Sequence, residues 1–179
     1  ILPIRTLQEV LRIMQYGVGG TLEIYITDNH VLFVCEGVEL FSKRIQGTYP
    51  DYTHIIPKQF TTTVRVDRME LIQAIKASSI FSKGGMNDVQ VTIRPTKDGH
   101  GTLSAYSSNA TVGENKTTLD VQIEGGENEV LLNHKYLLDG LQTIQEDTLF
   151  FGVVDGTSPC VIKPIEGKDY LYLVMPIRQ

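Results

Sequence analysis

A short strand leads directly into a helix in TTVRVDRMELIQAI, residues 62–75. Asp67 is a good N-cap, and Glu70 three residues later completes a start signal that resembles a capping box. Apolar residues follow at helical spacing, so Leu71, Ile72 and Ile75 are expected to face a hydrophobic core. This stretch predicts one strand and one amphipathic helix in immediate succession.

The same succession occurs three times along the chain. Helices are predicted to begin near Arg5, Asp67 and Asn133, about sixty residues apart, and each follows a short apolar segment. The first of these segments is 1–4. Such a repeat is too long for a simple solenoid and long enough for a βαβββ module. The sequence therefore predicts an α+β fold of repeated βαβββ modules, with helices on one face of antiparallel sheets.

The periodicity of apolar residues places the other elements. The predicted helix stripes are Leu7, Val10, Leu11 and Met14 in the first module and Leu137, Leu141 and Ile144 in the third. Strands are predicted at 22–26, 31–35, 39–44, 89–94, 101–107, 116–123, 129–132, 149–154, 160–164 and 170–175. Residues 95–99 are predicted to form a hairpin turn.

The segment GTYPDYTHIIP, residues 47–57, has the composition of an ordered crossing loop. We place a domain boundary after it. Residues 1–57 are then the second half of an incomplete domain, and residues 58–179 form a complete domain from two modules. Because the chain starts with Ile1 inside an apolar segment, we expect it to be a piece of a longer protein.

Composition is that of an ordinary globular protein, with 41% apolar and 21% charged residues. The net charge of −5 argues weakly against a tight grip on nucleic acid, which needs many Lys and Arg contacts to phosphate, and it leaves open a loose, water-mediated enclosure of DNA by one locally basic face. No apolar run has the length of a membrane helix, and we expect no signal peptide, since no basic segment followed by an apolar one is visible at the start of this sequence. Cys35 and Cys160 are predicted to be buried thiols in a reducing cytoplasm.

No motif of catalytic chemistry stands out. His30, His54, His100 and His134 lack the spacing of metal ligands, and the glycine pairs follow helices or sit in turns. The acidic residues are scattered. We therefore predict no catalytic residue, no metal site and no cofactor. An enzyme whose site is assembled only in space stays open as an alternative, and it would show a deep polar pocket.

The C-terminal segment 170–179 is strongly apolar. One interpretation is an edge strand with an exposed end. The other is a binding surface in which Met175, Pro176 and Ile177 form the wall of an apolar groove, since Met adapts to varied partners.

Three motifs, in this order, carry a family resemblance: GTYPDYTHIIP at 47–57, Asn133-x-x-Tyr136-Leu-Leu-Asp139, and VMPIR at 174–178. Over essentially its whole length the chain resembles the bacterial DNA sliding clamp, the beta subunit of DNA polymerase III. The resemblance implies half of a middle domain and a whole C-terminal domain. It also implies a cytoplasmic, non-enzymatic processivity factor, a homodimeric ring that encircles duplex DNA without reading its sequence.

The resemblance further implies a pocket for short linear motifs of the polymerase III alpha subunit, the clamp loader, other polymerases and repair proteins. Its matching residues here are Pro50, His54, Ile55, Met86, Asn133, Tyr136, Thr157, Pro159, Leu173, Val174, Met175, Pro176, Ile177 and Arg178. His54 departs from the Arg frequent in the family, Ile177 from Met, and Met86 from an aromatic residue. A further pocket wall in the family would lie upstream of Ile1.

Two more surfaces follow from the resemblance. Arg5, Arg12, Lys76 and Lys135 are the candidates that face DNA, and Ile80, Phe81 and Glu114 are the candidates for the dimer interface. A competing hypothesis is a peptide-binding module of the same fold that does not encircle DNA.

Overall fold

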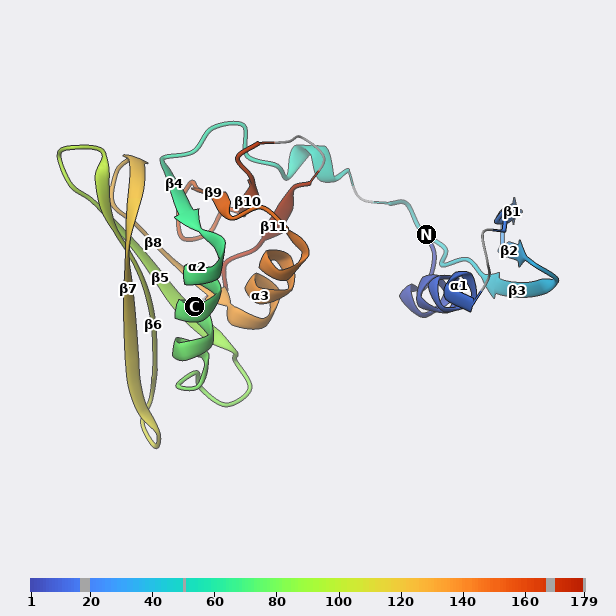
Figure 1. Cartoon of the computed structure of the whole chain (residues 1–179), viewed down its shortest axis with the longest axis horizontal. Coiled ribbons are helices and arrows are strands. Elements are labelled where there is room, and N and C mark those ends of the chain that lie inside the picture. Colours follow the sequence, from blue (N-terminus) through green and yellow to red (C-terminus); the bar gives the residue numbers. More distant parts are fainter. Residues whose placement is uncertain (17–19, 50, 167–169, 179) are drawn as a thin grey trace. The chain divides into compact units, whose positions relative to one another are not determined.

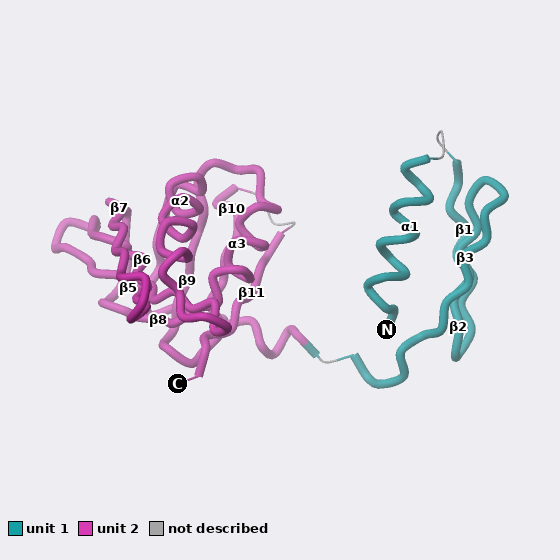
Figure 2. Tube along the Cα trace, turned by 90° about the horizontal axis from the view of Figure 1, so that it is seen from below, with its two compact units in different colours: residues 1–51 teal, residues 52–179 magenta. Residues whose placement is uncertain are grey.

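The computed structural model describes residues 1–16, 20–49, 51–166 and 170–178. The chain divides into two compact units, drawn in different colours in Figure 2: unit 1 with residues 1–51 and unit 2 with residues 52–179. The segment 52–57, predicted to close the first domain, clusters with unit 2. In the described part of the chain, no helix is long and apolar enough to cross a membrane.

Unit 1 is one helix on a three-stranded antiparallel sheet of order β1-β2-β3. Its elements are α1 (Ile4–Tyr16), β1 (Glu23–Ile26), β2 (His30–Cys35) and β3 (Val38–Lys43). The core of this unit is small and consists of Val10, Val31 and Phe33, with Leu2, Leu22 and Leu40 packed against it.

The start of unit 1 differs from the sequence prediction. The strand predicted at 1–4 is wrong, because the helix already begins at Ile4. Pro3 has no N–H to give to a strand ladder, and its carbonyl accepts hydrogen bonds from the N–H groups of Thr6 (3.0 Å) and Leu7 (3.4 Å). The proline thus ends the extended segment and opens the helix.

The apolar stripe of α1 is only partly buried. Val10 is 7% exposed, whereas Leu7, Leu11 and Met14 are between 39% and 61% exposed. Three short strands do not offer enough surface to cover a helix of this length. Unit 1 therefore leaves apolar helix surface in contact with solvent.

Unit 2 contains one large antiparallel sheet and two packed helices (Figure 1). The strand order is β11-β10-β9-β4-β7-β6-β5-β8. The elements are η1 (Tyr52–His54), β4 (Thr62–Asp67), α2 (Arg68–Ser79), β5 (Asp88–Pro95), β6 (His100–Asn109), β7 (Gly113–Gly125), β8 (Asn128–Asn133), α3 (His134–Thr143), β9 (Thr148–Val153), β10 (Cys160–Pro164) and β11 (Tyr172–Val174).

The two modules of unit 2 exchange their first strands. β4 pairs with β9 of the following module as well as with β7 of its own, and β8 pairs with β5 of the preceding module. A further backbone hydrogen bond runs from the N–H of Ile177, just after β11, to the carbonyl of Leu131 in β8 (2.7 Å). The segment after β11 therefore joins the two ends of the strand order, and neither module can complete its sheet alone.

Both helices of unit 2 pack on the same side of the sheet, as predicted. Asp67 caps α2 by accepting a hydrogen bond from the N–H of Glu70 (2.9 Å), which confirms the start signal read from the sequence. The stripes of the two helices meet the inward side chains of the strands. This core includes Leu71, Ile75, Leu137, Leu141, Ile144, Val64, Ile93, Leu103, Leu132, Phe151 and Ile162, each at most 5% exposed. Cys35 and Cys160 are buried thiols, as predicted.

Candidate partner-binding site

The first turn of α3 displays an aromatic ring to solvent. Asn133 ends β8 and caps the helix, because its side-chain oxygen accepts hydrogen bonds from the N–H groups of Lys135 (2.9 Å) and Tyr136 (3.4 Å). The cap fixes the direction in which the helix leaves the sheet. Tyr136 is left 60% exposed, so its ring is available for contact with a partner.

β11 lies beside this turn, and burial alternates with exposure from its last residue into the segment that follows it. Val174 is 3% exposed and belongs to the core, Leu173 is half-buried, and Met175 is 50% exposed. The hydroxyl of Tyr172 donates a hydrogen bond to the backbone carbonyl of Tyr136 (2.8 Å), which ties β11 to the first turn of α3. The exposed side chain of Tyr136 thus belongs to a helix that is joined directly to β11, and Met175 is the first residue after that strand.

The residues after β11 are held against the sheet. Pro176 is buried, and the N–H of Ile177 bonds to Leu131 as described above, while Arg178 is exposed. The ladder of β11 with β10 has already ended at Val174, and Pro176, which lacks an N–H, does not continue it. The tail therefore has a defined path along β8.

A rigid turn approaches the tail from β9. The carboxylate of Asp155 accepts hydrogen bonds from the N–H and hydroxyl of Thr157 (2.7 and 2.8 Å) and of Ser158 (2.7 and 3.0 Å). These bonds, chiefly those from Thr157, lower the pKa of Asp155 to about 2. The hydroxyl of Thr157 is thus engaged in holding the turn, and Pro159 beside it is half-buried.

The turn and the tail enclose a hollow of about 520 Å³. It brings together three of the predicted site residues, Thr157, Ile177 and Arg178. Its other lining residues were missed by sequence reasoning and are Gln90, Glu129, Leu131 and Gly156. Three of these four are in β5 and β8, and only strand pairing, which the sequence pattern does not supply, places them beside the tail.

Four further residues of the predicted pocket lie on other segments. His54 ends η1, and Ile55, 46% exposed, donates its N–H to the carbonyl of Tyr52 (3.0 Å). Met86, 49% exposed, lies in the turn after α2. Pro50 lies outside the described residues.

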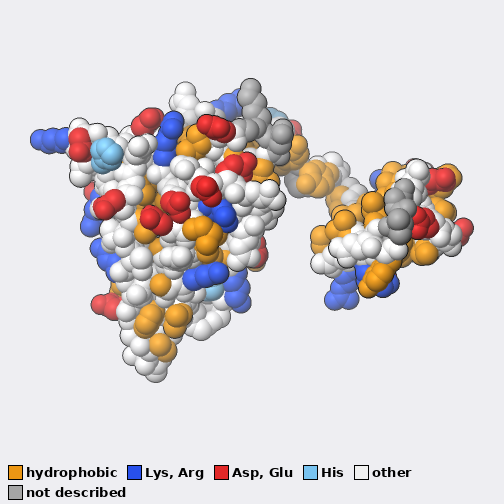
Figure 3. Space-filling view, in the orientation of Figure 1, with side chains coloured by type: hydrophobic (Ala, Val, Ile, Leu, Met, Phe, Trp, Pro, Cys, Tyr) orange, Lys and Arg blue, Asp and Glu red, His pale blue; other side chains and the backbone are white. Residues whose placement is uncertain are grey.

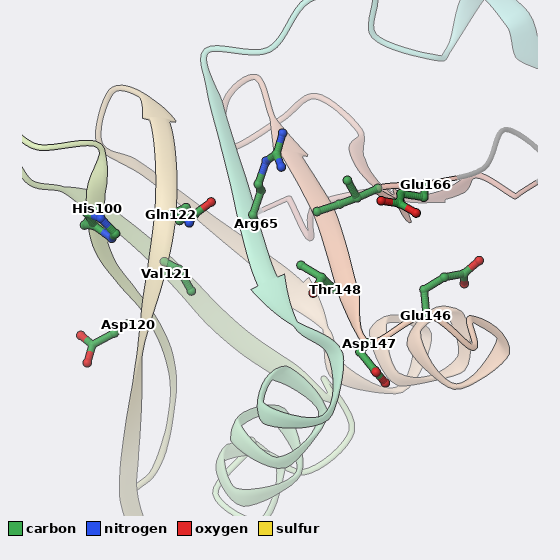
Figure 4. Close-up of a pocket in the computed structure, with 10 residues that line it drawn as sticks. Arg65, His100, Asp120, Val121, Gln122, Glu146, Asp147, Thr148 and Glu166 are labelled. Carbon is green, nitrogen blue, oxygen red and sulfur yellow. The ribbon is translucent and has the colours of Figure 1, made fainter.

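A larger hollow, of about 710 Å³, lies elsewhere on unit 2 and is lined mainly by polar residues (Figure 4). It opens where β4 and β7 diverge, with Glu146 and Asp147 of the loop after α3 on its other side. Figure 4 shows Arg65 and Asp120 pointing in different directions rather than at a common point. Among the residues that the structure describes, no three His, Cys, Asp or Glu side chains are grouped to hold a metal ion.

Residues 53–178 match the family described as DNA polymerase III beta subunit, C-terminal domain. The chain belongs to this family. It is 28% identical to the beta sliding clamp of Synechocystis sp. over 178 residues, which cover 99% of this chain and 45% of that protein. The chain thus spans about half the length of the curated relatives it matches.

Solved sliding clamps share the fold. The DNA polymerase III beta subunit of Thermotoga maritima matches with a TM-score of 0.87 and 29% identity, over 99% of this chain and 47% of that one. A Pseudomonas aeruginosa sliding clamp bound to griselimycin matches with a TM-score of 0.85 and 25% identity, over 100% of this chain and 47% of that one. The α+β fold predicted from the repeats, and the sliding-clamp fold that the family resemblance implied, are therefore confirmed.

Four basic residues are candidates for DNA contact because the chain belongs to the sliding-clamp family. All four are exposed. Arg5 and Arg12 lie on α1, where Arg12 forms an ion pair with Glu9. Lys76 lies in the last turn of α2 and Lys135 in the first turn of α3. On the face shown in Figure 3, Lys and Arg side chains are interspersed with Asp and Glu rather than gathered into one basic surface.

The candidate residues for the dimer interface lie at the C-terminal end of α2 and on the hairpin between β6 and β7. Ile80 is 69% exposed, and the ring of Phe81 lies about 4 Å from where a side chain on Gly113 would begin. Glu114 follows in β7 and accepts a hydrogen bond from the hydroxyl of Tyr106 (2.7 Å). The structure thus gathers an exposed apolar side chain and a carboxylate at one end of unit 2.

His134 should make the stability of unit 2 depend on pH. Burial lowers its pKa from 6.5, Lys135 acts in the same direction and Asp88 opposes it. Its Nδ1 is enclosed and has no hydrogen-bond partner among the described residues. The folded chain therefore disfavours the charged ring, whereas the unfolded chain takes up the proton near pH 6.5.

We expect the free energy of unfolding to be unaffected by this group above about pH 6.5 and to decrease as the pH falls toward the lower folded-state pKa. Urea unfolding at several pH values between about 8 and about 5 measures the effect, and a His134→Gln chain should lose this part of the pH dependence. An unchanged pH profile in that variant would contradict the prediction.

Proposed function

We propose that the chain is the partner-binding part of a DNA polymerase processivity clamp. Its site would bind short segments of replication proteins through apolar side chains. The observation that carries this proposal is the exposure of two large side chains, Tyr136 in the first turn of α3 and Met175 directly after β11, together with the hydrogen bond that joins α3 to β11. Apolar anchors of a partner would bury their own surface and that of both side chains.

The griselimycin-bound relative supports a ligand site in this fold. We assign Ile55, Tyr136, Leu173, Met175 and Pro176 to the apolar part of the site. Ile177 extends this apolar wall, and the polar margin consists of His54, Asn133, Thr157 and Arg178, with Met86 and Pro159 as neighbouring contacts and Val174 supporting the wall from the core. Pro50 belongs to the same proposal by its position in the loop motif.

We further propose that the whole protein is a homodimeric ring around duplex DNA in the bacterial cytoplasm. Ring closure would use Ile80, Phe81 and Glu114. Its lining would attract phosphates weakly through Arg5, Arg12, Lys76 and Lys135, which suits sliding because it reads no base. The role is then non-catalytic: the ring tethers the polymerase III alpha subunit, the clamp loader, other polymerases and repair proteins.

A matched pair of variants tests the partner site. A fluorescent peptide of the type Gln-Leu-x-Leu-Phe should bind the 179-residue chain with a dissociation constant of roughly micromolar magnitude. Met175→Ala should weaken binding about tenfold, because a large apolar contact is removed from an exposed position. Leu171, 41% exposed at the beginning of the same segment, supplies the control, and Leu171→Ala should leave the affinity unchanged.

Fluorescence anisotropy measures these affinities, and amide shifts in isotope-labelled chain locate the peptide. Absence of binding, or equal losses in the two variants, would sink the assignment of this surface. A separate experiment uses the full-length protein with its subunits covalently linked to one another. An encircling clamp should stay bound to circular DNA, whereas a peptide-binding module without DNA function should not bind it.

A further inference from the structure

Two tyrosines of β11 and the segment before it reach across to α3. The hydroxyl of Tyr172 donates to the carbonyl of Tyr136 at 2.8 Å, and the hydroxyl of Tyr170 donates to the carbonyl of Gly140 at 3.4 Å. These carbonyls are one helical turn apart. The shorter of the two bonds thus ends on the residue whose ring is exposed at the candidate site.

The ring of Tyr172 is also seated closely on the helix. A Cβ built on Gly140 would lie less than 3.0 Å from three carbons of this ring, so only glycine allows the strand to come so near. On its other side, Tyr172 is paired with Ile162 in the ladder between β10 and β11. Its backbone is therefore fixed by the sheet while its side chain is fixed by α3.

This double attachment of Tyr172 influences how far apart Tyr136 and Met175 lie. Met175 comes directly after Val174, the buried last residue of β11 and the last one paired with β10, so the sheet fixes the point from which Met175 extends. Tyr136 belongs to the first turn of α3, whose position follows the helix. The hydroxyl of Tyr172 forms a direct hydrogen bond between β11 and the first turn of α3.

We infer that Tyr172 is a positioning residue that holds Tyr136 and Met175 at the separation a partner's apolar anchors require. The inference rests on the proposed partner site. A preformed site loses less conformational entropy on binding, so loosening this bond should weaken the affinity of folded protein. A residue that only stabilised the fold would change the melting temperature and leave that affinity unchanged.

Tyr172→Phe removes the hydroxyl and keeps the ring on Gly140, and Tyr170→Phe is its matched control. The peptide affinity of the 179-residue chain is measured by fluorescence anisotropy far below the melting temperature, which is followed by circular dichroism. We expect Tyr172→Phe to weaken binding about fivefold, the value of one modest hydrogen bond. Tyr170→Phe should leave the affinity unchanged. The ¹³C shift of the Tyr136 carbonyl should change only in Tyr172→Phe.

The outcomes separate this inference from the proposed function. If wild-type chain binds and Tyr172→Phe binds equally well, the positioning role is overturned while the partner site stands. Equal losses of peptide affinity in Tyr172→Phe and Tyr170→Phe overturn it too, because the hydrogen bond from the Tyr172 hydroxyl to the Tyr136 carbonyl would then matter no more than the bond made by Tyr170. If wild-type chain does not bind the peptide at all, the proposed site fails and the inference fails with it.

Discussion

A Gly125→Ala chain should lose about 3 kcal/mol or more of the free energy of unfolding of unit 2. Gly125 has a φ of 103°, a backbone conformation that residues with a side chain rarely adopt. It also pairs with Thr62 at the junction of β7 and β4. A Cβ there would lie less than 3.0 Å from the carbonyl oxygen of Thr61, so the two strands would have to separate.

The neighbouring glycine gives a matched control. A Cβ on Gly126 meets nothing within 4 Å, and its N–H donates to the same Thr61 carbonyl at 3.2 Å. Gly126→Ala should therefore change the free energy of unfolding by no more than about 0.5 kcal/mol. Urea unfolding followed by circular dichroism compares the two. Similar stabilities of the two variants would contradict the account of this junction.

Replacing Phe151 with alanine should cost about 3–5 kcal/mol of the free energy of unfolding, the range found for deeply buried phenylalanine. Phe151 is 1% exposed at the centre of β9. Its pairing partners are Val64 in β4 and Ile162 in β10, both 0% exposed. The cavity left by the ring would therefore lie where the two modules of unit 2 meet, and the packed strands around it could close it only in part.

Phe41→Ala is the control for this substitution, since Phe41 lies on β3 of unit 1 and is 66% exposed. Its ring stacks on His30, with centroids 4.8 Å apart, so a loss of at most about 1 kcal/mol is expected. Amide exchange measured residue by residue assigns each loss to its unit. Rapid exchange confined to unit 1 in the Phe151→Ala chain would refute the prediction.

Local signals in the sequence were sufficient for most elements of unit 2. Asp67 and Asn133 begin α2 and α3 because a short polar side chain can accept hydrogen bonds from the first free N–H groups, a property of the residue itself. The hairpin turn predicted at 95–99 lies between β5 and β6, where Gly99 has a φ of 80°. Such features depend on neighbours in the chain and can be read from them.

Pairing over long distances could not be read in the same way. Alternation in β4 shows which side chains face the core, but it does not say that β9 and β7 will be its neighbours. The hollow between turn and tail was missed for that reason, since Gln90 and Glu129 reach it only through the position of β5 and β8. In unit 1, the apolar segment 1–4 has the pattern of a strand. Because Pro3 lacks an N–H and its carbonyl accepts hydrogen bonds from the first turn of α1, the segment leads into a helix instead.

The strand exchange has a consequence for the synthesis of this protein on the ribosome. β4 emerges early, yet the bond between Thr61 and Val153 that marks its pairing with β9 spans 92 residues. Until β9 has left the exit tunnel, one edge of β4 has no partner, and the module that contains β4 stays in a partly ordered state. Slow decoding between the two strands would prolong the exposure of that edge, so codon choice there should affect the yield of folded protein.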